Sequence, residues 1–272
     1  MSTVRKYEEY PAYETPSFTL YPFREKKELC SCQREYEERK YMRFAAVSKN
    51  GGKAAGSLEI SGGKEGILKW NLLPDYDGEA SREELIRLAA LYFIRDFQLE
   101  SLKVKVSDTP EKIPLLRKYG FIPSKTCQNR SEYYERSVGR SFDADRGIAF
   151  CGLACCVCRE NGNCAGCGKG GCGERETCRN YQCCSQKGLE GCWECADFPC
   201  DAPMLAKTRV RAFAEYVAEY GKERLMAALK RNEECGVLYH YDGQLTGDYD
   251  LFQRKEEIIA FLERGLRLDG EI

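Results

Sequence analysis

Apolar and polar positions alternate in the first half of the chain and recur at helical spacing in its last third. The alternation predicts three neighbouring strands, joined by glycine-containing turns, at residues 41–48, 54–61 and 66–73. Further on, strands at 101–107 and 131–138 flank a short helix that we expect to end at Gly120. Strands and helices that alternate in this way are typical of an α/β structure with a mixed sheet and flanking helices.

A long helix is predicted between these two groups of strands, at residues 81–97. Its apolar residues, among them Leu85, Leu88 and Tyr92, recur every three or four positions. Ser81 stands at the start of this pattern, and Glu84 follows three positions later, which is typical of a capping box that satisfies backbone N–H groups at a helix start. We therefore expect the helix to begin at Ser81.

Glycine and cysteine replace the periodic pattern between residues 148 and 203. This segment has too little apolar surface to build a core of its own. After it, apolar residues return at helical spacing in three stretches, residues 209–221, 222–236 and 252–266, with a loop expected before the last of them. The pattern predicts three parts: an α/β domain at 1–138, a Cys-rich module at 148–203, and a helical tail at 204–272 that packs on the module.

Composition narrows the possible partners. The 42 Lys and Arg residues are balanced by 43 Asp and Glu residues, a net charge of -1, so no bulk charge attracts nucleic acid or an anionic membrane. No apolar run approaches the roughly 20 residues of a membrane span, and the first residues, MSTVRKYEEYPAYE, lack the apolar segment of a signal peptide. We expect a cytoplasmic protein with neither nucleic acid nor membrane as its partner.

The cysteines indicate a metal site. Of the 17 cysteines, 13 lie between Cys151 and Cys200, and in a reducing compartment such a cluster is more often a set of metal ligands than a disulfide framework. Three Cys-x2-Cys pairs occur in it: Cys155/Cys158, Cys164/Cys167 and Cys192/Cys195. This spacing lets a tight turn present both sulfurs to one ion, at about 2.3 Å from zinc. The one histidine, His240, lies outside the cluster and is expected in a turn, so the predicted site is all-thiolate and zinc suits it best.

Other interpretations of the cysteines stay open. Cys151-x3-Cys155-x2-Cys158 also has the spacing that holds a [4Fe–4S] cluster, so an iron–sulfur protein is the main alternative to zinc. Radical enzymes with this spacing place it early in a barrel of about 200 residues, whereas only 114 residues follow Cys158. The cysteines outside the cluster are expected to act as small apolar residues: Cys30, Cys32, Cys127 and Cys235.

The motifs of the cluster follow one another in the order CGLACCVC, CAGC, a Cys-x4-Cys step beside Lys-Gly, CWEC and DFPC. In this order they resemble an uncharacterised bacterial family of Cys-rich proteins presumed to bind zinc, and the resemblance extends over residues 151–240. It implies the following candidate ligands: Cys151, Cys155, Cys158, Cys164, Cys167, Cys178, Cys183, Cys192, Cys195 and Cys200. Because the segment has too little apolar surface to fold alone, we expect it to bind about two zinc ions. Cys156, Cys172 and Cys184 fall outside the family's pattern.

Two segments of the first part carry a second resemblance. LLPDYDGEASREELIRLAALYFIRDF is similar to a strand, a phosphate-binding loop and a helix, and LKVKVSDTPEKIPLLRKYGFI to the next strand and a helix that ends in Tyr-Gly-Phe. Through them, residues 40–136 resemble the acetyl-CoA-dependent N-acetyltransferases (the GNAT family), which implies that fold and an acetyl-CoA site. By this resemblance the cofactor-binding residues are Leu72, Leu73, Gly78, Glu79, Ala80, Ser81 and Arg82.

The loop departs from the family's pattern in ways that bear on CoA binding. Backbone N–H groups at a helix start hold a pyrophosphate, and glycines let the chain come close to it. Gly78 and Ala80 take two small-residue positions, whereas Arg82 replaces a glycine. Asp77 and Glu79 add negative charge beside the expected diphosphate, so we expect CoA to bind weakly.

The resemblance implies transfer of an acyl group from CoA to an amine. Leu116 occupies the position at which many members carry a proton-donating tyrosine, and Tyr119 is the nearest phenol, so the catalytic residues are unknown and turnover is expected to be slow. One alternative is a non-catalytic, zinc-binding interaction protein on an acetyltransferase scaffold, with another protein as its partner. A second alternative is an iron–sulfur or redox protein.

Overall fold

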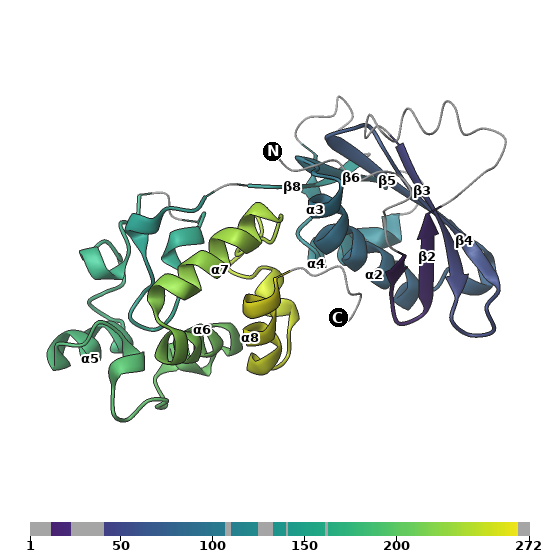
Figure 1. The fold of residues 1–272 in the computed structure, drawn as a ribbon. Coiled ribbons are helices and arrows are strands. Elements are labelled where there is room, and N and C mark those ends of the chain that lie inside the picture. Colours follow the sequence, from purple (N-terminus) through teal and green to yellow (C-terminus); the bar gives the residue numbers. More distant parts are fainter. Residues whose placement is uncertain are drawn as a thin grey trace. The chain divides into compact units, whose positions relative to one another are not determined.

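The computed structural model describes residues 12–22, 41–106, 110–124, 133–139, 141–160 and 163–265. They form two compact units, one that ends at Val138 and one that begins at Gly139, and Figure 1 shows the fold of each. Three cysteines expected to be small apolar residues lie outside the described residues: Cys30, Cys32 and Cys127. None of the described helices is long and apolar enough to cross a membrane.

The first unit is built on one mixed sheet. Among the described residues the sheet has eight strands, in the order β1-β2-β3-β4-β5-β6-β8-β7. The strands are β1 (Tyr13–Glu14), β2 (Phe18–Pro22), β3 (Tyr41–Ser48), β4 (Ala54–Ser61), β5 (Glu65–Leu72), β6 (Ser101–Lys105), β7 (Ile122–Pro123) and β8 (Tyr133–Ser137). The alternating pattern predicted β3 and β4 with their observed bounds, and the expected α/β fold is confirmed.

Helices lie between the strands from β5 to β7. They are η2 (Pro74–Tyr76), α2 (Glu79–Leu88), η3 (Ala89–Phe93), α3 (Ile94–Asp96), η4 (Pro110–Lys112) and α4 (Ile113–Lys118). From β3 onwards the chain forms three strands, a long helix, a strand, a short helix and a closing strand, with the short β7 just before the last (Figure 1). This is the order of elements that the resemblance to N-acetyltransferases implies.

The long helix begins earlier than the sequence predicts. α2 starts at Glu79, so the expected start at Ser81 is wrong. Glu84 does not act in a capping box, because its carboxylate accepts hydrogen bonds from Thr15 Oγ1 (2.7 Å) and from the backbone and hydroxyl of Ser17 (2.9 and 2.8 Å). Glu84 thus ties the helix to the turn between β1 and β2, two strands that the sequence pattern did not predict.

The same helix widens into a π-helical turn, η3, before it ends as α3. All five residues of η3 are buried. The ring of Phe93 in this turn stacks on Phe44 of β3, with 5.3 Å between centroids, and meets Tyr13 of β1 edge-on at 5.0 Å. Met42 and Ala46 are buried like Phe44, because alternate residues of a strand point to the same face. The helix therefore covers the apolar face of the sheet through an aromatic cluster.

Two features of the sheet shape the region after β5. The register between β3 and β4 shifts at a bulge, where Gly56 has φ +148° and a Cβ atom would lie 2.1 Å from Asn71 O. Only glycine allows this close approach of two backbones. β5 and β6 run parallel, but their pairing ends at Leu68 and Val104, while β5 continues to Leu72. Beyond Leu68, β5 pairs only with β4 among the described strands.

Short helices and turns make up the second unit. They are η5 (Ala144–Arg146), η6 (Cys155–Val157), η7 (Cys167–Lys169), α5 (Arg179–Lys187), η8 (Cys192–Glu194), η9 (Pro203–Ala206), α6 (Thr208–Tyr220), α7 (Lys222–Glu234), η10 (Asp248–Leu251) and α8 (Lys255–Arg264). The three helices of the tail agree with the helical pattern in the sequence. α5 was not predicted, because it lies where the sequence shows no apolar periodicity.

Buried cysteines take part in the core of the second unit. Cys151, Cys184 and Cys192 are buried together with Leu205 of η9 and Val210 of α6. The Cys-rich segment therefore completes its core with side chains of the helix that follows it, because its own apolar surface is small. The division of this unit between residues 203 and 204 stays a prediction.

Candidate functional site

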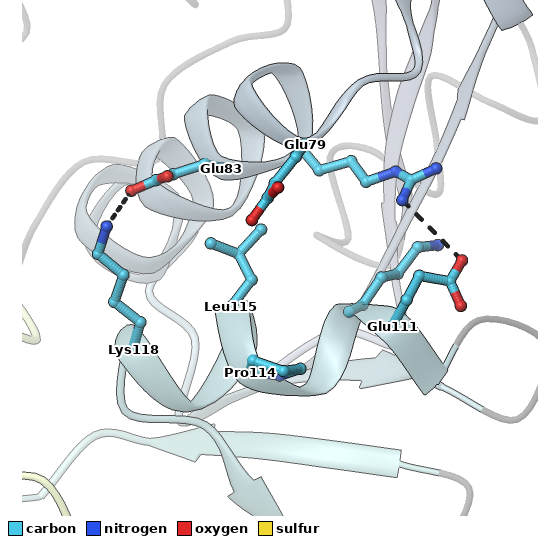
Figure 2. Close-up of a pocket in the computed structure, with 8 residues that line it drawn as sticks. Glu79, Glu83, Glu111, Pro114, Leu115 and Lys118 are labelled. Atoms are coloured by element: carbon cyan, nitrogen blue, oxygen red, sulfur yellow. Dashed lines mark hydrogen bonds and ion pairs between the residues drawn. The ribbon is translucent and has the colours of Figure 1, made fainter.

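A pocket of about 390 Å³ opens beside the start of α2, between α2 and the η4–α4 segment (Figure 2). It is lined by Glu79, Arg82, Glu83, Glu111, Lys112, Pro114, Leu115 and Lys118. Glu79 and Arg82 are the two expected cofactor-binding residues that line it. Gly78, Ala80 and Ser81 belong to the same helix start, where Gly78 is the N-cap and a Cβ atom at this position would meet nothing within 4 Å.

The backbone at the start of α2 suits an anion. The first N–H groups of an α-helix have no carbonyl partner within the helix, and the helix dipole makes this end positive. In α2 the first hydrogen bond of the helix runs from Arg82 N to Gly78 O, at 3.0 Å. The N–H groups of residues 79–81 therefore precede the hydrogen-bonded ladder, an arrangement that can hold phosphate oxygens.

The arginine at this helix start is paired with the loop before it. Arg82 Nε lies 2.7 Å from Asp77 Oδ1, and Arg82 Nη1 lies 3.9 Å from Glu111 Oε1. The hydrogen bond from Arg82 holds the pKa of Asp77 below its usual range, and the same bond raises the pKa of Arg82. Asp77 therefore stays ionised and offsets the positive charge that the pocket would otherwise offer a phosphate.

Two lysines contributed by the η4–α4 segment line the opposite wall of the pocket. Lys118 Nζ lies 2.5 Å from Glu83 Oε1, and this hydrogen bond lowers the pKa of Glu83. Lys112 Nζ lies 4.3 Å from the centroid of the Trp70 ring on β5. No sequence motif predicts either lysine, because the η4–α4 segment lies apart from the phosphate-binding loop in the chain and no characteristic spacing joins the two.

Leu72 and Leu73 lie beyond the point where the pairing of β5 with β6 ends, and their side chains differ in exposure. Leu72 is buried, whereas Leu73 is 52% exposed. Leu73 N donates to Ala55 O at 2.8 Å, and Leu73 O accepts from Tyr76 N at 2.8 Å. The turn that leads to α2 therefore occupies both backbone groups of Leu73, and its exposed side chain is what this residue can offer a ligand.

Neither Leu116, at the position of the family's proton-donating tyrosine, nor the nearby phenol of Tyr119 lines the pocket. Leu116 is fully buried and Tyr119 is 3% exposed. The Tyr119 hydroxyl donates to Glu83 Oε1 at 2.8 Å, and burial, together with this carboxylate, raises the pKa of Tyr119 far above its ordinary value. The structure thus keeps the phenol protonated but turned into the protein.

The candidate metal-binding cysteines differ widely in exposure. Cys151 and Cys192 are buried, Cys183 and Cys200 are exposed, and the other six lie between these limits. Across the described ranges, no three His, Cys, Asp or Glu side chains converge closely enough to hold a metal ion. The sulfurs instead form smaller groups.

One of these groups includes a cysteine outside the expected set. Cys184 Sγ lies 3.7 Å from Cys192 Sγ, and Asn180 Nδ2 lies 3.3 Å from Cys192 Sγ. Burial, with Cys192 next in effect, raises the pKa of Cys184 to about 12. On the exposed side of the same segment, Lys187 Nζ donates to Cys195 Sγ at 3.2 Å.

Burial raises the pKa of three candidate sulfurs, Cys151, Cys155 and Cys167, and backbone N–H groups offset part of this effect. Leu153 donates to Cys151, Cys167 donates to Cys155, and Phe150 donates to Cys167. Burial acts in the opposite direction and raises the pKa of Cys167 to about 12. Because zinc binds thiolates, N–H groups directed at sulfur suit metal ligands. The donor chemistry therefore fits zinc, although the described side chains do not meet at one point.

The structure also places the histidine beside the cysteines. His240 lies in the predicted loop but is 7% exposed, and its Nδ1 lies 3.8 Å from Cys158 Sγ. Burial, with the guanidinium of Arg209 second, lowers the pKa of His240 to about 4, so the ring is neutral at pH 7. No spacing in the sequence indicated this contact, because 82 positions separate the two residues.

Comparison with known families agrees with the resemblance of the Cys-rich segment. The family described as "Protein of unknown function (DUF3795)" matches residues 159–204. This range includes most of the candidate ligands and lies within the segment for which a resemblance to an uncharacterised Cys-rich family was expected. No curated protein matches the chain in sequence.

The solved structures to which the chain is similar include acetyltransferases. An acetyltransferase from Agrobacterium tumefaciens shares 15% identity over 46% of this chain and 93% of that chain, with a TM-score of 0.36. The spermidine/spermine N-acetyltransferase of Vibrio cholerae, in complex with manganese ions, shares 13% identity over 44% of this chain and 90% of that chain, with a TM-score of 0.34. At these TM-scores the similarity supports no statement about cofactor or substrate.

Proposed function

We propose that the protein is a zinc-binding N-acyltransferase of the acyl-CoA type. In this proposal the first unit transfers an acyl group from CoA to an amine, and the Cys-rich segment of the second unit binds about two zinc ions. The observation that carries the proposal is the start of α2, where residues 79–81 have N–H groups ahead of the helical ladder and the adjoining pocket contains Arg82, Lys112 and Lys118.

Each part of the pocket has a role in this proposal. CoA supplies a thioester whose acyl carbon an amine can attack. Residues 79–81 donate backbone N–H groups to the pyrophosphate, and the two lysines from the η4–α4 segment offset its charge. Residues 69–72 of β5, which pair with β4 but not with β6 among the described strands, provide backbone groups along which the pantetheine can lie.

The charges around the pocket support weak rather than tight binding. Asp77 already neutralises Arg82, and Glu79, Glu83 and Glu111 line the same space. A carboxylate near a helix N-terminus that must accept a diphosphate costs about 1 kcal/mol in binding. Two such charges lower affinity about tenfold or more, which corresponds to a dissociation constant of tens of micromolar or weaker.

Titration calorimetry with acetyl-CoA tests the first part of the proposal. We expect binding in the range of tens of micromolar to about millimolar, and formation of an acetylated amine that mass spectrometry detects. The variant Lys118→Glu should weaken binding at least about tenfold, because it reverses a charge in the pocket. Lys53→Glu makes the same charge change in the exposed turn before β4 and should leave binding unchanged. Equal losses in both variants, or no heat at millimolar acetyl-CoA, would contradict CoA binding.

Elemental analysis tests the zinc part. Three Cys-x2-Cys pairs support about two equivalents of zinc per chain. Less than one equivalent of any metal in freshly purified protein, with thiols that titrate as free, would contradict this part. A brown protein that absorbs at about 400 nm would favour the iron–sulfur alternative.

A second candidate function is supported by the buried phenol. Tyr119 hydrogen-bonds Glu83 inside the protein, and Leu116 is fully buried, so the structure offers no phenol to the pocket from this helix. A zinc-binding interaction protein on an acetyltransferase scaffold agrees with that observation. This second function differs from the acyltransferase in its expected results: about two equivalents of zinc, no binding of acetyl-CoA and no acetylated product.

A further inference from the structure

A buried chain of polar contacts links Asp250, Arg209 and His240 to Cys158. Arg209 Nη1 lies 2.6 Å from Asp250 Oδ2, and Arg209 Nη2 lies 3.4 Å from His240 Nε2. The other ring nitrogen of His240, Nδ1, lies 3.8 Å from Cys158 Sγ. Arg209 and His240 are only 6% and 7% exposed. The chain of contacts therefore connects α6 and the loop at residues 237–250 to the Cys-rich segment.

Arg209 fixes the loop that carries the histidine. Its guanidinium donates to Tyr239 O at 2.9 Å and to Leu245 O at 3.0 Å, on either side of His240. It also lies 4.3 Å from the centroid of the Tyr239 ring. Asp248, 1% exposed, accepts hydrogen bonds from a backbone N–H and a tyrosine hydroxyl of the same loop. The position of the imidazole is therefore set by the fold of the loop and not by its contact with sulfur.

The contact with Arg209 decides which ring nitrogen carries the proton. A guanidinium has N–H donors and no acceptor, so it hydrogen-bonds His240 Nε2 only if that nitrogen is unprotonated. A neutral imidazole then carries its proton on Nδ1, the nitrogen that faces Cys158. This assignment follows from the hydrogen-bond network. In this tautomer Nδ1 has a proton to donate to sulfur and no lone pair for a metal ion.

We propose that His240 is a positioning residue of the zinc site, whose Nδ1–H donates a hydrogen bond to the Cys158 thiolate and which is not itself a ligand. The inference rests on the proposed zinc binding. A hydrogen bond to a thiolate stabilises the form that binds metal and holds the sulfur in one orientation. Cys151 and Cys155 receive such bonds from the backbone; for Cys158 the donor is a side chain 82 positions away.

The nitrogen NMR signals of the imidazole test the tautomer directly. His240 is the only histidine in the chain, so protein labelled with 15N-histidine gives one pair of ring nitrogen signals. In zinc-loaded protein at pH 7 we expect a protonated Nδ1 and an unprotonated Nε2. A proton on Nε2 with Nδ1 bound to metal would make His240 a ligand and overturn the proposal. Protons on both nitrogens would overturn it as well.

Two substitutions test whether the hydrogen bond matters. His240→Leu removes the donor, and His240→Asn places an amide N–H close to the position of Nδ1. We expect His240→Leu to lower zinc affinity by about 10- to 100-fold, measured by competition with a chromophoric chelator, and His240→Asn to keep most of it. Both variants should still bind the wild-type number of zinc ions at saturation, because no ligand is lost. Circular dichroism must show the same helix content in both variants.

Cobalt substitution separates a positioning role from ligation. If His240 only donates, cobalt-loaded wild type and His240→Leu have the same ligand-field spectrum. A changed spectrum, or the loss of one equivalent of metal in His240→Leu, would identify a ligand and overturn the inference. Equal zinc affinity of wild type and His240→Leu would also overturn it. Wild-type protein with less than one equivalent of metal refutes the proposed zinc binding instead, and this result is obtained before any variant is made.

Discussion

Arg82 and Asp77 form an ion pair at the start of α2, with 2.7 Å between Nε and Oδ1. The pair joins the first turn of the helix to the loop that precedes it, and it occupies the first cationic side chain of the helix. A phosphate that binds here has to compete with Asp77 for the guanidinium. The same loop that resembles a phosphate-binding motif thus contains its own counter-ion.

Removal of this counter-ion should strengthen CoA binding. In Asp77→Asn the side chain keeps its size but loses its charge, so Arg82 can turn to a phosphate. We expect acetyl-CoA to bind about fivefold to tenfold more tightly, a gain of about 1 kcal/mol, measured by titration calorimetry. Asp75→Asn, an exposed change in the same loop, should have a smaller effect. Weaker binding in Asp77→Asn would mean that Asp77 orients Arg82 for the ligand.

Acid should weaken the first unit partly through Glu83. The hydrogen bond from Lys118 lowers the pKa of Glu83 from its ordinary value of 4.5. A carboxyl with a depressed folded pKa stabilises the fold above its unfolded pKa, and this stability is lost as pH falls through the folded value. Glu83→Gln should therefore lose less stability than wild type when the pH drops from 5 to about 3.

Fluorescence can follow this acid effect in the first unit alone. Trp70 and Trp193 are the two tryptophans, so a Trp193→Phe background leaves Trp70 as the reporter in urea unfolding. Glu79→Gln, an exposed change at the start of the same helix, is the control and should keep the wild-type pH dependence. Identical curves for Glu83→Gln and wild type would show that the Glu83–Lys118 pair adds nothing to stability.

A side chain at residue 56 should disrupt the β4 bulge. Gly56→Ala would place a Cβ atom 2.1 Å from Asn71 O, on a backbone with φ +148°. We expect a loss of more than about 3 kcal/mol in the free energy of unfolding. Gly52→Ala is a matched control, because its φ is +64° but nothing lies within 4 Å of its Cβ position. It should cost about 1 kcal/mol. Equal losses in urea unfolding would rule out the close approach as the cause.

Chelation should unfold the second unit and spare the first. Zinc bound by thiolates supplies on the order of 10–16 kcal/mol in small peptides, and the Cys-rich segment has little apolar surface to replace it. A strong chelator should therefore remove the folded signal of Trp193, measured in a Trp70→Phe background, while Trp70 keeps its own signal in the Trp193→Phe background. An unchanged Trp193 signal after complete removal of the metal would show that the core around Cys151 and Leu205 suffices.

Alternation of apolar residues predicted part of the sheet because those strands are long and covered on one face. β3 buries every second residue, so the pattern and the strand coincide. The sequence pattern did not predict β1 and β2. β1 has only two residues, and the two strands lie in a short segment that contains three prolines. Their pairing comes from contacts with β3 and from Glu84, which no local pattern encodes.

Local motifs misplaced the helix start for a physical reason. Ser81 and Glu84 have the spacing of a capping box, but a carboxylate is available for capping only if nothing else binds it. Thr15 and Ser17, almost 70 positions earlier, hold the Glu84 carboxylate, and Gly78 serves as the N-cap. The competition between a local and a distant partner is decided in the folded protein.

The amino-acid sequence by itself determined the α/β class of the first unit, the concentration of thiols between Cys151 and Cys200, and the loop before α2. Spacing along the chain encodes these features, because periodicity and short motifs are local. Only the tertiary structure decided that Asp77 neutralises Arg82, that Lys118 and Glu83 close one side of the pocket, and that His240 meets Cys158. These contacts join residues whose spacing carries no pattern, and they exist because packing brings separate segments together.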